Sequence, residues 1–309
     1  MKKIFIISLI SWSLFSACQK DVKPTSPTTD IKISNARSII GDTLVFKLGD
    51  TCKFEITGYS DNITFWNGAA GNRYINHQRN HRENQPVMSF TSTAANSTQT
   101  NTLQVLATTK LKSRDSVTVI NAPWTDITSR FALATSATAV NSGSVNLTDL
   151  MSNGNDSLLI AFKYMGKMGS IQPTWTISNL VISGVATAEA NQTLLSLEND
   201  SRYWTVFANV RTPANARWVA SNTALTIVGG AATQPDNTSW ILSKSIFVNV
   251  TSPDVPTAIV KNVTSSLNNN IYVHKYAQKG VYKASFICFG TTTGGSKSKI
   301  IEFNIKVTD

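Results

Sequence analysis

The chain has 309 residues, enough for two domains, and a formal net charge of +10 at pH 7. Its Lys and Arg residues are scattered rather than clustered in one stripe, so we expect no nucleic-acid partner. Only 15% of the residues are charged, whereas Asn, Thr and Ser are abundant, a composition typical of extracellular β-sandwiches. Short β-rich segments recur and no long segment has a 3.6-residue period, which predicts an all-β fold.

Residues 1–17 have the features of a signal peptide. A basic pair, Lys2 and Lys3, is followed by an apolar stretch and by a small-residue cleavage site directly before Cys18. The arrangement resembles the lipobox of bacterial lipoproteins, so we expect a lipid anchor on Cys18 and the membrane as a partner. The alternative is an ordinary secretory signal followed by a chance Cys. A transmembrane helix would need about 20 apolar residues, more than this stretch supplies.

Residues 18–30 are expected to tether the protein to the membrane. Residues 19–21 (QKD) partly resemble the polar, acidic signal that sends Bacteroidota lipoproteins to the cell surface. The Pro, Thr and Ser residues of 22–30 favour an extended, semi-rigid spacer. We therefore expect an outer-membrane lipoprotein that faces outward, with a periplasm-facing anchor as the alternative.

Residues 31–85 contain three short β-rich segments bounded by turn residues, namely 43–48, 51–57 and 62–66. They predict one part of a sandwich.

Residues 86–252 contain further predicted strands at 103–108, 117–120, 158–164, 174–182, 204–208, 224–228 and 240–250. The run 123–133 predicts a crossing from strand to loop, anchored by Trp124 and Ile127. The order of elements resembles a jelly roll of the galactose-binding-like kind, the fold of many carbohydrate-binding modules. In that resemblance 158–164 and 174–182 are the paired central strands. Two smaller sandwiches that divide near residue 186 are the alternative.

The segment 274–307 predicts a β-hairpin that needs further strands. Every second residue of Tyr282–Cys288 is apolar or small, and the same period returns in Ile301–Val307. The segment resembles the last two strands of a PKD or immunoglobulin-like domain. Two strands alone are marginally stable in water, and the best partners are the strands within 31–85.

We therefore expect one PKD/Ig-like sandwich split between residues 31–85 and 253–309. Residues 86–252 would be a second domain inserted into it, a jelly-roll sandwich.

Two cysteines besides Cys18 fall on inward faces of the split sandwich. Cys52 opens its strand, whereas Cys288 lies six residues past Tyr282 in its own strand. Six residues at ~3.3 Å each give an offset near ~20 Å, and a disulfide needs Cα atoms within about 7 Å. We expect two buried free thiols.

Five segments carry a wider resemblance: DNITFWNGAAGNRY (61–74), APWTDITSRF (122–131), LLIAFKY with PTWTISN (158–164 and 173–179), SWILSKSI (239–246) and the final hairpin. On these segments the chain resembles a Bacteroidota lipoprotein family known as domain of unknown function 5017. The resemblance implies a surface lipoprotein that accompanies an outer-membrane uptake system, with polysaccharide as ligand and the transporter complex as partner. These motifs are structural, so they imply no activity.

No catalytic or metal-binding constellation is evident. His77, His81 and His274 lack an HExxH pattern or a nearby Cys pair, so we expect structural roles and no metal. No G-x-S-x-G motif is present, so a serine hydrolase is not indicated. The sequence 152–157 (SNGNDS) has the oxygen ligands of a structural Ca²⁺, but turn chemistry explains the same residues, so we expect no cofactor.

Glycoside hydrolysis would require two carboxylates that flank the bond. The acidic residues that could be placed in such a pair are Asp115, Asp126, Asp149, Asp156, Glu189, Glu198, Asp200 and Asp236. Most stand beside Thr, Asn or Ser, as turn and cap residues do, so we expect a non-catalytic protein.

Exposed aromatic rings are the best ligand candidates, because the C–H faces of sugars stack on them. Trp124, Trp175 and Trp240 lie within apolar strands and are expected in cores. The candidate ligand-binding residues stand in polar settings instead: Tyr203, Trp204, Trp218 and Trp66. Packing in the interior is the alternative for each.

The sequence thus predicts a non-catalytic cell-surface lipoprotein that captures glycan. The alternative is a structural or adhesive lipoprotein that binds a protein partner.

Overall fold

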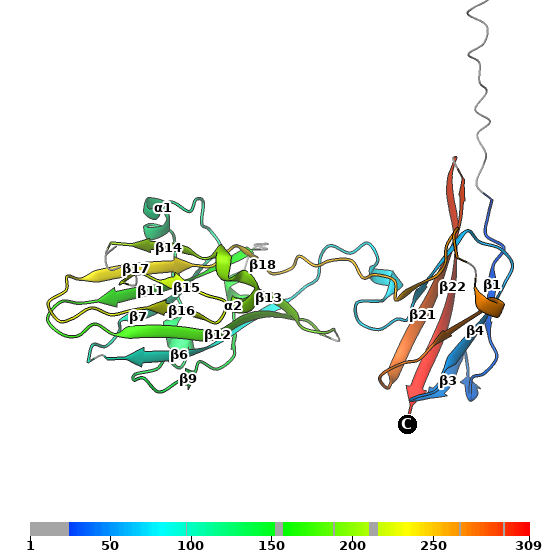
Figure 1. Ribbon diagram of the computed structural model, residues 1–309, viewed down its shortest axis with the longest axis horizontal. Coiled ribbons are helices and arrows are strands. Elements are labelled where there is room, and N and C mark those ends of the chain that lie inside the picture. Colours follow the sequence, from blue (N-terminus) through cyan, green and yellow to red (C-terminus); the bar gives the residue numbers. More distant parts are fainter. Residues whose placement is uncertain are drawn as a thin grey trace, which may run out of the picture. The chain divides into compact units, whose positions relative to one another are not determined.

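The computed structural model describes residues 25–96, 98–151, 157–187, 189–209, 216–265, 267–292 and 294–309. These residues form two compact units, and the fold is all-β (Figure 1). Unit 1 comprises residues 25–78 and 253–309, and unit 2 comprises residues 79–252. Unit 2 is one body and does not divide near residue 186.

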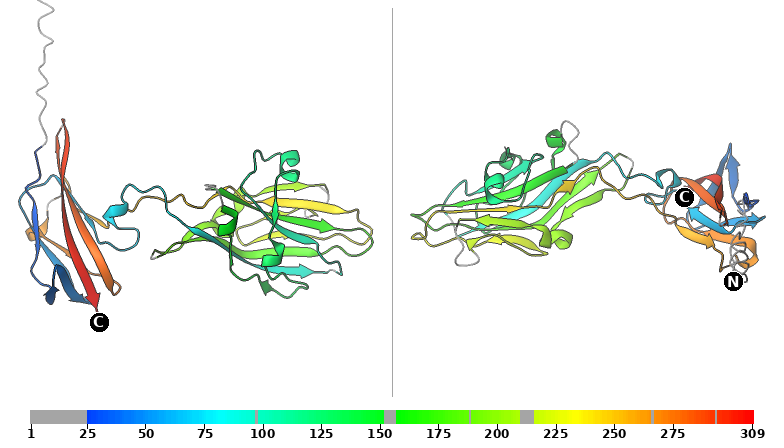
Figure 2. Two further views of the ribbon diagram at one scale, coloured as in Figure 1. Left: turned by 180° about the vertical axis from the view of Figure 1, so that it is seen from behind. Right: turned by 90° about the horizontal axis from the view of Figure 1, so that it is seen from above.

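Unit 1 has two sheets, ordered β1-β4-β20 and β19-β5-β21-β22-β3-β2. Every pairing in them is antiparallel except that of β22 with β3, which is parallel. The elements are β1 (Asp30–Ile33), β2 (Ser38–Ile40), β3 (Thr43–Lys47), β4 (Cys52–Thr57), β5 (Asn62–Trp66), the 3₁₀ helix η1 (Tyr74–Asn76), β19 (Ala258–Lys261), the 3₁₀ helix η6 (Asn268–Asn270), β20 (Ile271–His274), β21 (Gly280–Thr292) and β22 (Gly295–Thr308). The blue early strands and the orange-to-red β21 and β22 lie side by side in all views (Figures 1 and 2).

The core of unit 1 follows from the period of two. In β4 every second side chain is buried, beginning with Cys52, and the alternate ones face water. Phe54 from β4 meets Phe286 from β21 at a centroid distance of 4.8 Å, and Phe65 from β5 meets Phe286 at 4.7 Å. The edge-on pair of Phe54 and Phe286 stabilises the contact between the two sheets, whereas Phe65 and Phe286 are tilted partners on neighbouring strands of one sheet. Cys52 and Cys288 are both buried free thiols, as the sequence predicts.

Unit 2 also has two sheets. One runs β10-β6-β12-β16-β15, with β13 on β12 and β9 on β6, and the other runs β14-β17-β11-β7-β8, with β18 on β11. The strands are β6 (Gln85–Ala95), β7 (Leu103–Thr108), β8 (Thr125–Asp126), β9 (Val140–Asn141), β10 (Val145–Asn146), β11 (Ser157–Gly166), β12 (Thr174–Val185), β13 (Gln192–Ser196), β14 (Thr205–Ala208), β15 (Val219–Ala220), β16 (Ala224–Ile227), β17 (Asn237–Leu242) and β18 (Ile246–Phe247). The helices are α1 (Ser116–Ile120), α2 (Leu197–Asp200), and the 3₁₀ helices η2 (Thr128–Arg130), η3 (Thr148–Met151) and η4 (Ser201–Tyr203).

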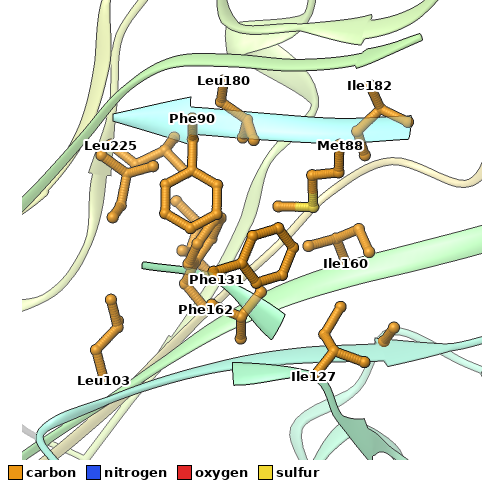
Figure 3. Close-up of a cluster of buried hydrophobic side chains, with 14 of the residues drawn as sticks. Met88, Phe90, Leu103, Ile127, Phe131, Ile160, Phe162, Leu180, Ile182 and Leu225 are labelled. Carbon is orange, nitrogen blue, oxygen red and sulfur yellow. The ribbon is translucent and has the colours of Figure 1, made fainter. Parts of the chain in front are cut away.

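The main core of unit 2 lies between its two sheets. Figure 3 shows Met88 and Phe90 from β6 facing Ile160 and Phe162 from β11. The rings of Phe90 and Phe162 are perpendicular at a centroid distance of 5.5 Å. Ile127 is fully buried, so the expected anchor of the 123–133 crossing lies in this core.

Three details of unit 2 differ from the sequence prediction. Residues 117–120 belong to helix α1 and not to a strand, because Asp115 caps the turn by accepting a hydrogen bond from the Thr118 N–H at 2.9 Å. The predicted strand 240–250 is two strands, β17 and β18, since Ser243 between them bonds back to β11 through its hydroxyl at 3.0 Å.

The third difference concerns β11 and β12. They are central strands, as expected, but of opposite sheets, so they do not pair with each other. β12 pairs instead with β6, a strand of eleven residues.

Candidate ligand groove on unit 1

A groove with a volume of about 830 Å³ lies on the outer face of the six-stranded sheet of unit 1. Since Ala284 and Phe286 point into the core, the alternate residues of β21 point outward, and these include Val281, Lys283 and Ser285. The outward side chains of β22 complete the floor: Ile300, Glu302 and Asn304. A volume of this size is in the range of about 300–1,000 Å³ that is usual for ligand sites.

The loop between β5 and η1 forms one wall of the groove. Gly68 in this loop has φ +81°, and a Cβ added to it would lie 2.5 Å from the backbone oxygen of Lys283. Only glycine allows this conformation and this approach together, so the loop rests directly on β21.

The wall is also held by Asp254 and Val255, which follow unit 2 in the chain. The buried carboxylate of Asp254 accepts hydrogen bonds from the Arg73 N–H at 2.9 Å and from the Asn76 side chain at 3.3 Å. The Asn72 amide donates to the Val255 carbonyl at 2.7 Å. These contacts form the wall before any ligand arrives, which lowers the entropy lost on binding.

Tyr74 and Tyr282 are the aromatic residues that line the groove, and Tyr74 belongs to its wall, in η1. The Tyr74 ring stacks on His77 at a centroid distance of 4.2 Å and an interplanar angle of 10°. Trp66 meets Tyr74 edge-on at 5.4 Å. Tyr74 is half-buried and lines the groove, so the other two rings hold it in place.

The floor of the groove combines apolar and polar groups. Val281 is 75% exposed and Ile75 in η1 is 87% exposed, and both of these large apolar side chains line the groove. Lys283 and Glu302 also line it, and Lys283 Nζ lies 2.7 Å from a carboxylate oxygen of Glu302. An exposed ion pair of this kind is held weakly, so both groups can turn to bind a ligand.

Asn304 extends the polar part of the floor, whereas Ser285 beneath it is almost fully buried. Asn304 donates to Asp42 at 2.6 Å, and the Ser285 hydroxyl lies 3.4 Å from Glu302. The groove therefore suits a ligand that has both apolar faces and many hydroxyl groups.

Two of the four predicted ligand residues are buried, so the expectation of exposed rings is wrong for them. Trp218 is 2% exposed and donates through Nε1 to the Ser239 carbonyl at 3.2 Å. Trp66 is buried beside Tyr74 and donates to the Thr64 hydroxyl at 3.3 Å. In both cases packing within the unit accounts for the ring.

The other two predicted residues remain partly accessible. Tyr203 is 46% exposed, but the Arg202 guanidinium lies 4.8 Å from the centre of its ring and Lys244 Nζ lies 5.8 Å from it. Trp204 is half-buried against the core of unit 2, 6.5 Å from Phe162. Tyr203 and Trp204 belong to unit 2, and Trp66 belongs to unit 1.

The candidate carboxylates serve as turn, cap or ion-pair residues. Their partners are Thr118 for Asp115, Gln104 and Thr128 for Asp126, Arg130 for Asp149, Arg79 for Glu189, Lys244 and Ser196 for Asp200, and Lys167 for Asp236. Glu198 is an exposed residue in the first turn of α2. Within the described ranges no three His, Cys, Asp or Glu side chains are placed to hold a metal ion. Cys18, Asp156 and residues 152–156 of the candidate calcium segment lie outside the described residues.

Sequence reasoning missed Tyr74 and the outward residues of β21. Tyr74 ends the quoted segment 61–74, but its partner surface on β21 lies more than 200 residues later in the chain. The available signal was the isolated Val281, an apolar residue on the polar face of the predicted hairpin.

The fold and the groove define an all-β protein of two sandwich units, one of which is inserted into the other. The chain belongs to the family described as a domain of unknown function (DUF5017), which matches residues 17–201. Two of the quoted segments, 239–246 and the final hairpin, lie outside this match. No curated protein and no solved structure matches the chain. Among the described residues, no helix has the length and apolar character that crossing a bilayer requires.

Proposed function

We propose that this protein is a non-catalytic lipoprotein, anchored through Cys18 to the outer face of the outer membrane, that captures glycan beside an uptake system. The groove on unit 1 carries this proposal, because it places the Tyr74 ring beside exposed apolar side chains and an ion pair that can turn toward hydroxyl groups. Sugars present both C–H faces and hydroxyls, and they match this mixture.

The lipid anchor rests on the sequence that precedes Cys18. Unit 1 as a PKD/Ig-like sandwich and unit 2 as a jelly roll of the galactose-binding-like kind are part of the same proposal. They are supported by the pairing of early and late strands in unit 1 and by the two facing sheets of unit 2.

The test is affinity electrophoresis of the purified protein in gels cast with neutral and acidic polysaccharides. Tyr74→Ala should abolish retardation by at least one polysaccharide. Tyr203→Ala is the matched control, because it removes an exposed tyrosine outside the groove. Retardation that survives Tyr74→Ala but is lost with Tyr203→Ala would move the site to the residues predicted from sequence. No retardation of the wild type by any polysaccharide would contradict glycan capture.

A protein partner is the second candidate function, and one observation favours it. Strand β2 is an edge of the six-stranded sheet, and its Ile39 and Ile40 are both exposed. An exposed edge with apolar side chains can accept a strand from another protein. Lys substituted at both positions should reduce capture of outer-membrane proteins in pull-downs and leave polysaccharide retardation unchanged.

A further inference from the structure

We propose that unit 2 holds a second sugar site, specific for a neutral glycan, in a pocket that we call the loop pocket. The pocket has a volume of about 420 Å³. It lies where the connection from β6 to β7, the segment after η2 and the start of β12 meet, and its lining includes Thr98, Thr100, Asn101, Thr135 and Trp175. The inference rests on the proposed function, glycan capture, and adds a site and a ligand class to it.

The loop that forms the pocket is held in one conformation. Gln99 donates through its amide to the Lys167 carbonyl at 2.7 Å and accepts from the Lys167 N–H at 2.9 Å. Asn101 has φ +55°, a left-handed conformation that Asn tolerates better than most residues. The pocket is therefore preformed, which lowers the entropy lost on binding.

The floor of the pocket is apolar and rigid. Trp175 is buried, and its Nε1 donates to the Thr102 hydroxyl at 3.0 Å, which fixes the plane of the ring. Leu103, Leu133 and Ala134 lie beside it in the lining. Trp175, Leu103 and Ala134 are buried, so the partly exposed Leu133 is the apolar side chain that a C–H face of a sugar would contact.

The rim offers hydrogen-bonding groups that the protein itself does not use. Within the described ranges of the chain, the side chains of Thr98, Thr100, Asn101 and Thr135 have no hydrogen-bond partner. Three hydroxyls and one amide can both donate and accept, as the hydroxyls of a sugar do. This rim matches a ligand with several adjacent hydroxyl groups.

The absence of charge in the lining decides the class of ligand. None of the lining residues in the described part of the chain carries an ionisable side chain. An anionic or cationic ligand would lose water here without gaining a counter-charge, which is strongly unfavourable. The groove of unit 1, in contrast, contains Arg73, Lys283 and Glu302. The two sites would therefore prefer different parts of a glycan.

The test uses the purified full chain with neutral polysaccharides (xylan, galactomannan, mixed-linkage glucan) and acidic ones (pectin, alginate), followed by calorimetry with the corresponding oligosaccharides. The combined variant Thr100→Val, Asn101→Gly and Thr135→Val removes three rim groups. Val keeps the shape of Thr, and Gly tolerates the left-handed backbone at position 101. Thr193→Val on β13 is the control, because Thr193 is exposed and lies outside the pocket.

The combined variant should weaken binding of a neutral polysaccharide by about tenfold or more, since several hydrogen bonds are lost together. Thr193→Val should bind like the wild type, and an unchanged melting temperature would show that the variant folds. Unchanged binding of neutral polysaccharide by the combined variant would overturn the proposal of a sugar site in the loop pocket. If Tyr74→Ala then abolished that binding, glycan capture by the groove would stand alone. If the combined variant lost binding of the neutral polysaccharide while Tyr74→Ala kept it, the result would support the sugar site in the loop pocket and contradict the one in the groove. A wild type that binds none of the polysaccharides would contradict both.

Discussion

Replacement of Gly68 by Ala tests whether the wall of the groove depends on close contact between its loop and β21. Gly68 and Gly71 lie in the same loop with nearly equal φ values, +81° and +83°. An L-residue in this region costs roughly 1–2 kcal/mol, and that term applies to both positions. A Cβ at Gly71 meets nothing within 4 Å, whereas at Gly68 it lies 2.5 Å from the Lys283 oxygen and 2.7 Å from the Lys283 nitrogen.

The Lys283 backbone cannot easily move away, because β21 is paired with β22 along its whole length. The overlap at Gly68 should therefore add about 1–3 kcal/mol, as other overpacked sites do. We expect Gly68→Ala to lower the free energy of unfolding of unit 1 by roughly 2–5 kcal/mol and Gly71→Ala by roughly 1–2 kcal/mol.

The two buried thiols make unit 1 observable on its own. A chain that starts at residue 25 contains only Cys52 and Cys288, and both lie in the core of unit 1. Burial raises the pKa of Cys52 to about 12, so the folded protein should react slowly with thiol reagents. Pulsed thiol labelling across a urea series then gives the unfolding transition of unit 1. Tryptophan fluorescence reports mainly unit 2, which contains five of the six tryptophans after residue 24.

The thiol transition should move further in Gly68→Ala than in Gly71→Ala, and the fluorescence transition should move in neither. Equal shifts in the two variants would refute the contact argument, because backbone conformation alone would then explain both. Binding of the polysaccharide captured by the wild type should also weaken in Gly68→Ala, although no side chain of the groove is removed.

Three further predictions follow from single residues. Burial lowers the pKa of His274 from 6.5. The unfolded chain therefore takes up a proton first, and unit 1 should lose stability as the pH falls below about 6.5, until the lower folded pKa is reached. In His274→Gln the urea midpoint should depend less on pH in this range. An equal slope of midpoint against pH in the wild type and the variant would contradict this prediction. The buried Nε1 of Trp204 has no hydrogen-bond partner among the described residues, whereas that of Trp218 donates to Ser239. Trp218→Phe should therefore be less stable than Trp204→Phe by about 1–3 kcal/mol in thermal unfolding, and the reverse order would count against it. Cys18→Ser should release the protein from the membrane fraction and abolish incorporation of labelled fatty acid. A wild type that incorporates no labelled fatty acid would contradict the proposed lipid anchor.

The strands that the sequence locates best are those with strict alternation. The period of two places Phe54, Phe65 and Phe286 on inward faces, and the structure brings these three rings together. The sequence does not predict β6. Its buried positions alternate along the whole strand, but the last two are Ser92 and Ala94, which are too small or too polar to show a hydrophobic pattern. Alternation along a strand therefore identifies the buried face only where the buried side chains are large and apolar.

The groove could not be predicted because it depends on register between distant segments. Ser285 lies opposite Trp66 in the pairing of β21 with β5, and this register brings Tyr74 beside the floor of the groove. Nothing in either segment alone specifies that pairing. Trp218 was wrongly expected at the surface because its neighbours in sequence are polar. The strand that follows it, β15, has only two residues, too few for a period to show which way the ring points.

The order of strands in unit 1 has a consequence for folding during synthesis. Strands β21 and β22, at residues 280–308, are inserted between β5 and β3, which are made more than 200 residues earlier. Until they emerge, β3 and β5 have no neighbour on that side, whereas every strand of unit 2 is already complete. Unit 2 can therefore fold during synthesis before unit 1 is complete, and closing so long a loop is slow. A polypeptide truncated before β21 would have an incomplete sheet in unit 1 that is exposed to proteases, so the topology favours degradation of shortened products.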